Sequence, residues 1–279
     1  PPAAKNLFIK RFLDFQKFLI MRDNMITNNP ELSAAIEAAR KAGEILKENF
    51  GQKYRVIRKS PKEMVSVVDM QAQKVILETL EPRFPNYGII TEERSNNVNK
   101  EGKNWIIDPL DGTHNYIAGL PFSGISIGLA KGNDFQLGVI LFPMEDRLYY
   151  AVKGEGAYFN DMPIEVSPSL ELSKSIVSFD NQFHLNKNSF EYYRRLVERA
   201  FTTRILGTAT NDLCMTAEGK LGGRIWVNTK ICDIAAGILI VTEAGGKVTG
   251  FDGTACTLDS KQVVASNGKI HEELLDIVK

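Results

Sequence analysis

Two aspartates, Asp108 and Asp111, follow an apolar run at residues 105–107 that is typical of a buried strand. Pro109 lies between them and cannot donate to a sheet ladder, so we expect the strand to end there. The turn that follows can direct both carboxylates, together with the Leu110 carbonyl, at one point. This arrangement is suited to binding a cation.

Gly112 and Thr113 come directly after the aspartate pair and open a predicted helix. The first backbone N–H groups of a helix have no partner within the helix and can bind an anion. Carboxylates for a cation beside amides for a phosphate are what metal-assisted phosphoryl transfer requires. A surface turn with a helix cap is the alternative, because Asp-Gly is common in turns.

Further acidic residues stand at similar places along the chain. Glu92 and Glu93 follow the apolar residues 88–90, and Asp233 begins the run D-I-A-A-G at 233–237, whose small residues would let a helix approach other backbone closely. A solvated loop and a helix N-cap are the structural alternatives. The 3 histidines and 3 cysteines are not at metal-ligand spacing. A metal site would therefore use carboxylates and favour a hard cation such as Mg²⁺ over zinc.

Composition excludes several classes of function. Lys+Arg and Asp+Glu both number 34, which argues against a general electrostatic attraction to nucleic acid or an anionic membrane. No run of apolar residues is long enough for a transmembrane helix. The few, scattered cysteines fit a reducing compartment, and we expect a cytoplasmic protein.

Apolar periodicity predicts the elements that must position these groups. We expect helices near residues 32–46, 69–80, 191–200, 212–218, 234–244 and 271–278. We expect strands near residues 54–59, 87–91, 105–108, 124–130, 135–142, 147–152 and 263–266. Ser66 or Asp69 is the expected cap of the second helix. Strands grouped between helices predict an α+β fold with two sheets.

Residues 1–29 differ from the rest of the chain. Phe8, Phe12, Phe15 and Leu19 fall near helical spacing among basic residues. We interpret this extension as an extra helix, a dimer arm or an added segment, with organelle targeting or a surface anchor as the alternative.

The acidic stretches resemble those of a known family. Residues 108–116, D-P-L-D-G-T-H-N-Y, resemble the first signature of the inositol monophosphatase family, D-P-[IL]-D-G-T-x-N-[FY]. Residues 232–237, C-D-I-A-A-G, and the E-A-G-G at 243–246 resemble its second signature, W-D-x-A-A-G followed by E-A-G-G. Glu92 and Asp69 stand where the family has G-E-E-S and V-T-x-x-D. The resemblance runs in the same order from about residue 30 to the C-terminus.

The resemblance implies a layered α-β-α-β-α sandwich of the inositol monophosphatase and fructose-1,6-bisphosphatase type, formed by residues 30–279 as one domain. Subdomains of about 30–180 and 181–279 are an alternative description. It also implies a homodimer and a lithium-sensitive phosphomonoesterase with two or three Mg²⁺ ions. A metal-activated water would attack the phosphate ester directly.

The resemblance further implies a role for each residue of the acidic stretches. Glu92, Asp108 and the Leu110 carbonyl would hold a first ion. Asp108, Asp111 and Asp233 would hold a second, and a weaker third would depend on Glu92. The implied catalytic residues are Asp69, Glu92 and Thr113. The implied substrate-binding residues are Asp111, Gly112, Thr113, Ala209, Trp226 and Asp233.

Two positions depart from the family pattern. Cys232 replaces the tryptophan of the second signature, and Trp226 stands where a glutamate often contacts inositol hydroxyls. Inositol monophosphate remains the first expectation for the small phosphorylated substrate. Fructose 1,6-bisphosphate, histidinol phosphate and a nucleotide 3′-phosphate are the alternatives. A regulatory binding protein that keeps the fold without catalysis is the non-enzyme alternative, and we expect no membrane or nucleic-acid partner.

Overall fold

The computed structural model describes residues 27–53, 56–60, 63–92 and 98–279. The predicted amphipathic segment around Phe8 to Leu19 lies outside the described residues, and so does Glu93.

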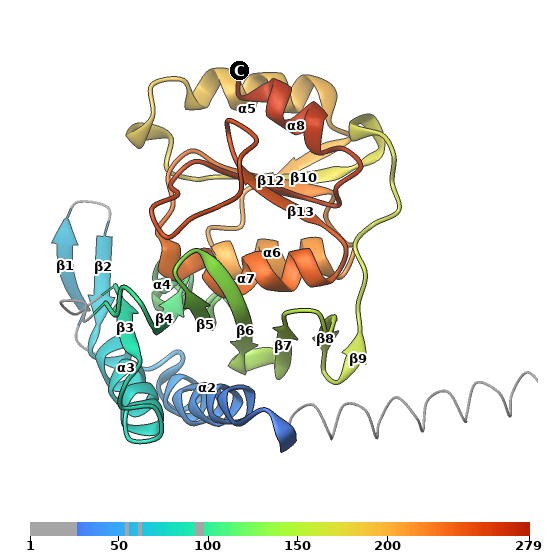
Figure 1. Cartoon of the computed structure of the whole chain (residues 1–279). Coiled ribbons are helices and arrows are strands. Elements are labelled where there is room, and N and C mark those ends of the chain that lie inside the picture. Colours follow the sequence, from blue (N-terminus) through green and yellow to red (C-terminus); the bar gives the residue numbers. More distant parts are fainter. Residues whose placement is uncertain (1–26, 54–55, 61–62, 93–97) are drawn as a thin grey trace, which may run out of the picture.

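Five layers stack in the order helix, sheet, helix, sheet, helix, as predicted (Figure 1). The outer helices on one side are α2 (Pro30–Asn49) and α3 (Val67–Leu80). The central helices are α6 (Ala209–Ala217) and α7 (Ile231–Glu243). The outer helices on the other side are α5 (Ser189–Arg199) and α8 (His271–Ile277). The six helices predicted near residues 32–46, 69–80, 191–200, 212–218, 234–244 and 271–278 are therefore present, with ends shifted by a few residues.

A seven-stranded sheet lies between α2/α3 and α6/α7 in the order β3-β4-β5-β6-β7-β8-β9. Its strands are β3 (Gly88–Thr91), β4 (Lys103–Asp111), β5 (Gly124–Lys131), β6 (Asp134–Phe142), β7 (Arg147–Val152), β8 (Ala157–Phe159) and β9 (Met162–Pro163). Strands β3 and β4 pair in parallel, and the later neighbours pair antiparallel. The strands predicted near residues 124–130, 135–142 and 147–152 are confirmed as β5, β6 and β7, and they pair antiparallel in that order.

A five-stranded sheet in the order β11-β10-β12-β14-β13 lies between the central helices and α5/α8. Its strands are β10 (Ile176–Phe179), β11 (Thr202–Arg204), β12 (Gly223–Trp226), β13 (Lys247–Gly250) and β14 (Val263–Ser266). The shorter elements are the ribbon β1 (Val56–Ser60) and β2 (Glu63–Ser66), the helix α4 (Thr113–Ile117), and the 3₁₀ turns η1 (Pro143–Glu145), η2 (Leu172–Lys174) and η3 (Phe183–Leu185).

The prediction that Pro109 ends its strand is wrong. Strand β4 continues to Asp111, and the register against β5 shifts between Asp108 and Asp111. A proline is tolerated at such an irregularity because the ladder is already interrupted there. The irregularity, rather than a turn beyond the strand, redirects the two carboxylates.

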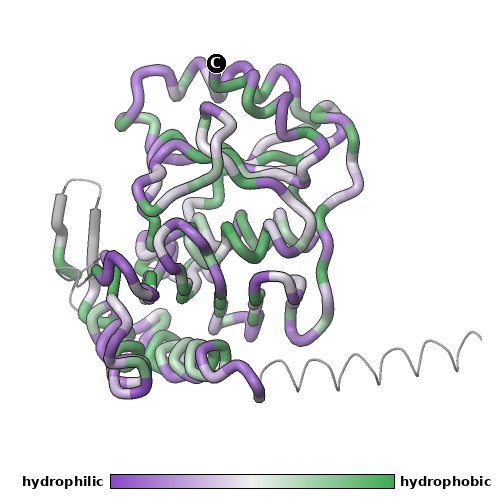
Figure 2. The backbone as a smooth tube through the Cα atoms, in the orientation of Figure 1, coloured by the Kyte–Doolittle hydropathy of each residue, from purple (hydrophilic) through white to green (hydrophobic). Residues whose placement is uncertain are grey.

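Helix α7 approaches the seven-stranded sheet closely enough that side chains on both sides must be small. A Cβ atom at Gly138 would lie 2.3 Å from the carbonyl oxygen of Ala236, and one at Gly128 would lie 3.1 Å from the Cβ atom of Ala235. The helix is apolar along most of its length, as a helix covered on both faces must be (Figure 2). This packing fixes the first turn of α7 against the sheet.

The alternative of Asp233 as a helix N-cap is also wrong. Lys230 is the N-cap of α7, and Asp233 lies within the first turn.

Three apolar clusters fill the spaces between the layers. One lies under α2 and α3 and includes Trp105, one surrounds α7 and includes Ile240, and one lies under α5 and α8 and includes Leu274. In the part of the chain that the structure describes, no helix combines the length and the apolar character needed to span a membrane.

Candidate metal centre and active site

Three carboxylates meet where β3, β4 and α7 come together. Glu92 follows β3 directly, Asp108 lies in β4, and Asp233 lies in the first turn of α7. Each offers one oxygen, and the three oxygens lie within 4.8 Å of one another. The sequence predicted all three as metal ligands, and the structure brings them together.

The electrostatics of this cluster are unfavourable without a cation. Burial, and then repulsion by Asp233, Asp111 and Glu92, raise the pKa of Asp108 well above its ordinary value. Burial, and then repulsion by Asp111 and Glu92, raise the pKa of Asp233 in the same direction. The buried Oδ1 of Asp233 has no hydrogen-bond partner among the described residues. A buried oxygen of this kind calls for a ligand, since leaving it unpaired costs free energy.

A hard divalent cation fits this donor set. The cluster consists of carboxylate oxygens, the ligands that Mg²⁺ prefers. Cys232 lies beside Asp233, but burial, and then repulsion by Asp108 and Asp233, raise the pKa of its thiol. Its Sγ lies 3.9 Å from the Ile90 carbonyl oxygen and is not one of the ligand atoms of the cluster, so the donor set consists of carboxylate oxygens, which suit a hard cation better than zinc.

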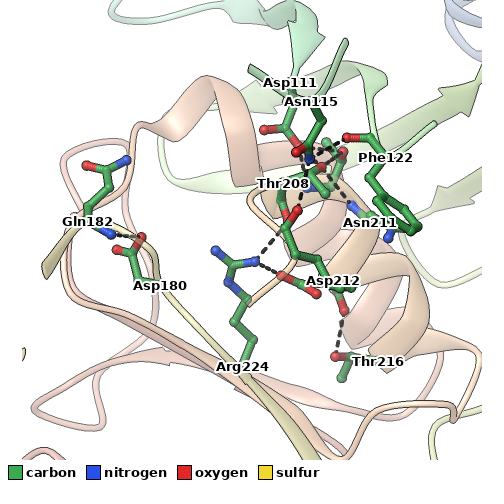
Figure 3. A network of polar contacts seen from close by, with 12 residues as sticks. Asp111, Asn115, Phe122, Asp180, Gln182, Thr208, Asn211, Asp212, Thr216 and Arg224 are labelled. Carbon is green, nitrogen blue, oxygen red and sulfur yellow. Dashed lines mark hydrogen bonds and ion pairs between the residues drawn. The ribbon is translucent and has the colours of Figure 1, made fainter. Parts of the chain in front are cut away.

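Asp111 is held by Thr208, which Figure 3 labels beside it, and by Thr210. Its Oδ2 accepts hydrogen bonds from Thr208 Oγ1 at 2.5 Å, Thr210 Oγ1 at 2.6 Å and the Thr210 backbone N–H at 2.7 Å. Its Oδ1 accepts none of these bonds. Asp111 is not one of the three carboxylates within 4.8 Å, although it is near enough to raise the pKa of Asp108 and Asp233. The predicted set of Asp108, Asp111 and Asp233 is therefore brought close together, but Glu92 rather than Asp111 completes the tight cluster.

Asp69 and Thr113 form a second polar group beside the cluster. Asp69 lies in the first turn of α3, where the Ser66 backbone N–H donates to its Oδ2 at 2.9 Å and the Ser66 hydroxyl donates to the same oxygen. Ser66 is the observed cap of α3, as expected. Thr113 Oγ1 lies 3.2 Å from Asp69 Oδ1 and 3.0 Å from the Leu110 carbonyl oxygen. Burial raises the pKa of Asp69 despite the hydrogen bonds from Ser66 and Thr113.

Gly112 joins β4 to the short helix α4 and requires the absence of a side chain. Its φ angle is +80°, and a Cβ atom there would lie 2.6 Å from the carbonyl oxygen of Phe122. The side chain of Asn115 then donates to the carbonyl oxygens of Phe122 and Leu206, each at 2.9 Å. These contacts hold the predicted amides of Gly112 and Thr113 at the end of β4.

A polar pocket opens beside Asp111 and Asp233. It is lined by Asp111, Asp180, Asn181, Gln182, Gly207, Thr208, Ala209, Arg224, Trp226, Asn228, Thr229 and Asp233. The pocket thus includes Ala209 and Trp226, both predicted to bind substrate. Trp226 is only 1% exposed, however, so its side chain offers little surface to a substrate.

Arg224 is a functional candidate that the sequence interpretation missed. Its guanidinium is buried, stacks 4.7 Å from the ring centroid of Trp226, and donates to the Thr208 carbonyl oxygen at 2.8 Å. It also pairs with the buried Asp212 of α6 (Figure 3). An arginine between apolar residues of a strand was the available signal, because such a charge is rarely buried without a partner.

Asp180 and Lys230 were missed as well. The Asp180 carboxylate accepts from three backbone N–H groups, those of Gln182 at 3.1 Å, Val227 at 3.2 Å and Asn228 at 3.3 Å. Lys230 Nζ lies 2.7 Å from Glu92 Oε1. Neither residue belongs to a recognisable motif in the sequence, so only the fold reveals its place.

Comparison with known proteins gives a consistent result. The model of the inositol monophosphatase family matches residues 27–279. A Nus factor SuhB of Pasteurella multocida is 35% identical over 257 residues, covering 90% of this chain and 96% of the relative. An inositol-1-monophosphatase of Mesorhizobium japonicum is 35% identical over 255 residues, covering 89% and 96%. A fructose-1,6-bisphosphatase/inositol-1-monophosphatase of Thermotoga maritima is 34% identical over 248 residues, covering 88% and 95%.

Solved structures agree with the sequence matches. The extragenic suppressor protein SuhB of Bartonella henselae superposes with a TM-score of 0.85 at 33% identity, covering 90% of this chain and 99% of that one. An IMPase of Thermotoga maritima superposes with a TM-score of 0.83 at 33% identity, covering 90% and 97%.

Proposed function

Because the chain belongs to the inositol monophosphatase family, we propose that it is a Mg²⁺-dependent phosphomonoesterase whose first substrate is inositol monophosphate. The observation that carries this proposal is the cluster of Glu92, Asp108 and Asp233, with oxygens within 4.8 Å of one another. A phosphate ester carries negative charge and would be repelled by this cluster unless cations were bound between them.

The chain offers a complete set of residues to hold those cations. Glu92, Asp108 and Asp233 would take the first, and the Asp111 carboxylate, which lines the pocket, would extend the site toward it. The Leu110 carbonyl, implied as a ligand by the family resemblance, would add a further oxygen. When bound, divalent cations would neutralise phosphate charge and lower the pKa of a water. The protein's own side chains would orient that water and accept its proton.

Asp69 and Thr113 would perform the proton transfer. Thr113 Oγ1 lies within hydrogen-bond distance of two acceptors, Asp69 Oδ1 and the Leu110 carbonyl oxygen. Its hydroxyl proton is therefore committed to one of them, which leaves the lone pairs of Oγ1 to accept from a water. The raised pKa of Asp69 brings this carboxyl closer to the operating pH, as a proton acceptor requires.

The charges of the residues that line the pocket favour binding of a neutral, hydroxyl-rich leaving group rather than one that carries a second phosphate. Among the lining residues that the structure describes, Arg224 is the one cation, and it is already paired with Asp212. The Asp180 carboxylate adds a negative charge on the same side, and Asn181 and Gln182 contribute amides. Inositol monophosphate fits this lining better than a bisphosphate does. A second phosphate would need a cationic side chain that is not already paired with a carboxylate.

A regulatory role without catalysis is the second candidate. A relative at the same identity as the inositol-1-monophosphatase is named Nus factor SuhB. Catalysis is the first choice because Asp69, Glu92, Asp108, Asp111, Thr113 and Asp233 are all retained.

The test is phosphate release from a panel of four esters: inositol 1-phosphate, fructose 1,6-bisphosphate, histidinol phosphate and adenosine 3′,5′-bisphosphate. Each is assayed with Mg²⁺, with chelator, and with Mg²⁺ plus lithium. The variant Asp108→Asn is measured beside Asp259→Asn, which removes an aspartate charge from an exposed position of the chain.

We expect inositol 1-phosphate to be hydrolysed fastest, only with Mg²⁺, with lithium as an inhibitor, and with activity lost in Asp108→Asn but kept in Asp259→Asn. Faster hydrolysis of another ester would keep the mechanism and change the substrate. Mg²⁺ binding without hydrolysis of any of the four esters would favour the regulatory role.

A further inference from the structure

Lys230 places a positive charge at the edge of the carboxylate cluster. Its Nζ lies 2.7 Å from Oε1 of Glu92, and the lysine side chain is 46% exposed. Glu92 is one of the three carboxylates whose oxygens lie within 4.8 Å of one another. The ammonium is therefore a counter-ion for an acidic group that would otherwise coordinate a metal.

The position of Lys230 is fixed by the same turn that positions a metal ligand. Lys230 is the N-cap of α7, and its carbonyl oxygen accepts from the Asp233 backbone N–H at 3.1 Å. The close contact between α7 and the sheet, at Gly138 and Ala236, holds this turn in place. The lysine backbone thus cannot move away from the site without displacing Asp233, whereas its exposed side chain can swing into solvent.

An ammonium and a divalent cation cannot share Glu92 without a free-energy cost. A hard cation binds a carboxylate oxygen at about 2.0–2.6 Å, and Lys230 Nζ already lies 2.7 Å from Oε1. Two cations on one carboxylate would lie only a few ångström apart and repel each other. An ion that takes Glu92 as a ligand must therefore displace the lysine or bind beside it more weakly.

We propose that Lys230 is a built-in competitor for the Glu92 side of the metal centre, and that it weakens divalent-cation binding there in a salt-dependent way. This inference rests on the proposed metal site but requires no particular substrate. It gives the chain a residue that sets metal affinity without itself being a metal ligand.

The test is a titration of the chelator-stripped chain with Mn²⁺, in which electron paramagnetic resonance measures the free ion. Lys230→Met is expected to bind Mn²⁺ about three- to tenfold more tightly than the parent at low ionic strength, the size of effect that one exposed charge produces. Added salt should reduce the difference in Mn²⁺ affinity between Lys230→Met and the parent, because the competition between the Lys230 ammonium and Mn²⁺ is electrostatic. Lys230→Arg keeps the charge and should stay close to the parent.

Lys247→Met is the matched control. Lys247 pairs with Glu272 at 3.0 Å, and its side chain is also 46% exposed, but it lies in β13 of the other sheet. It should leave Mn²⁺ affinity unchanged, which separates a local effect from a change in net charge. Thermal unfolding gives a second readout: Mn²⁺ should raise the melting temperature of Lys230→Met by more than it raises that of the parent.

The outcomes separate this inference from the proposed function. Parent-like or weaker Mn²⁺ binding by Lys230→Met, or equal tightening by Lys247→Met, would overturn the role of Lys230 and leave the phosphatase standing. Normal Mn²⁺ binding with weaker binding of the phosphate ester would instead assign Lys230 to the substrate, and would also overturn the proposal. A parent that binds no Mn²⁺ would remove both the inference and the metal site on which the proposed function depends.

Discussion

Replacing Asp108 by Asn should stabilise the chain against unfolding when divalent cations are chelated, and the gain should grow with pH. Burial and repulsion by Asp233, Asp111 and Glu92 raise the pKa of Asp108 in the folded protein. The folded state then binds a proton more tightly than the unfolded state does. Stability is therefore greatest below the unfolded pKa of about 4 and is lost as the pH rises through the folded value.

The size of the effect follows from the geometry of the cluster. Oxygens of Glu92, Asp108 and Asp233 lie within 4.8 Å of one another. At a separation of 4.8 Å, each pair of unit charges repels by about 3.5 kcal/mol for an effective dielectric constant of about 20. Proton uptake by the folded parent relieves part of this repulsion. We therefore expect the free energy of unfolding of Asp108→Asn to exceed that of the parent by about 1–3 kcal/mol near pH 8 and by almost nothing near pH 4. Asn keeps the Oδ1 acceptor that receives the Leu110 N–H at 3.0 Å, so that hydrogen bond survives.

Urea unfolding in chelator, followed over this range of pH, measures the effect. Asp259→Asn, at an exposed position, should follow the parent curve throughout. Adding Mg²⁺ should stabilise the parent and stabilise Asp108→Asn much less, because the variant has lost a metal ligand. An Asp108→Asn curve parallel to the parent at every pH would refute the account of the cluster as a set of mutually repelling carboxylates.

Two further predictions concern the groups that support the site. Thr210→Val removes the hydroxyl that donates to Asp111 Oδ2 at 2.6 Å and keeps the side-chain shape. Urea unfolding should show a loss of about 1.5–3 kcal/mol, whereas a loss below about 0.5 kcal/mol would mean that this hydroxyl does not hold the carboxylate. Arg224→Met leaves the buried Asp212 charge unpaired and should cost about 3–5 kcal/mol. The double variant with Asp212→Leu should recover part of that loss in the same assay, and simple additivity of the two single losses would contradict the pairing.

The layers of the fold could be predicted because their signal is local. The strands β5 and β6 are apolar runs separated by a short polar turn, and helix α2 has a regular apolar face that ends before Gly51. Burial of one face against a neighbouring layer is enough to produce these patterns. The position of the first acidic pair at a strand end followed from the same reasoning, but its geometry did not.

Pro109 shows where that reasoning stops. A proline was expected to end the strand, yet β4 continues past it because the partner strand β5 resumes pairing at Gly124 opposite Asp111. Whether a proline ends a strand or sits at an irregularity depends on the neighbouring strand, which the local sequence does not specify. The same holds for Arg224 and Asp212, whose pairing joins β12 to α6 and leaves no spacing pattern along the chain.

The small residues after Asp233 show how packing and chemistry are linked in this fold. Ala235 and Ala236 face Gly128 and Gly138 at distances that leave no room for larger side chains. This contact sets how far α7 lies from the sheet, and so it also sets the distance from Asp233 to Asp108 on β4. A larger residue at either glycine would move the helix outward and separate the carboxylates, because helix and sheet are close-packed and cannot absorb the added volume. The glycine and alanine positions therefore determine the spacing of the metal centre, although none of them supplies one of its ligand atoms.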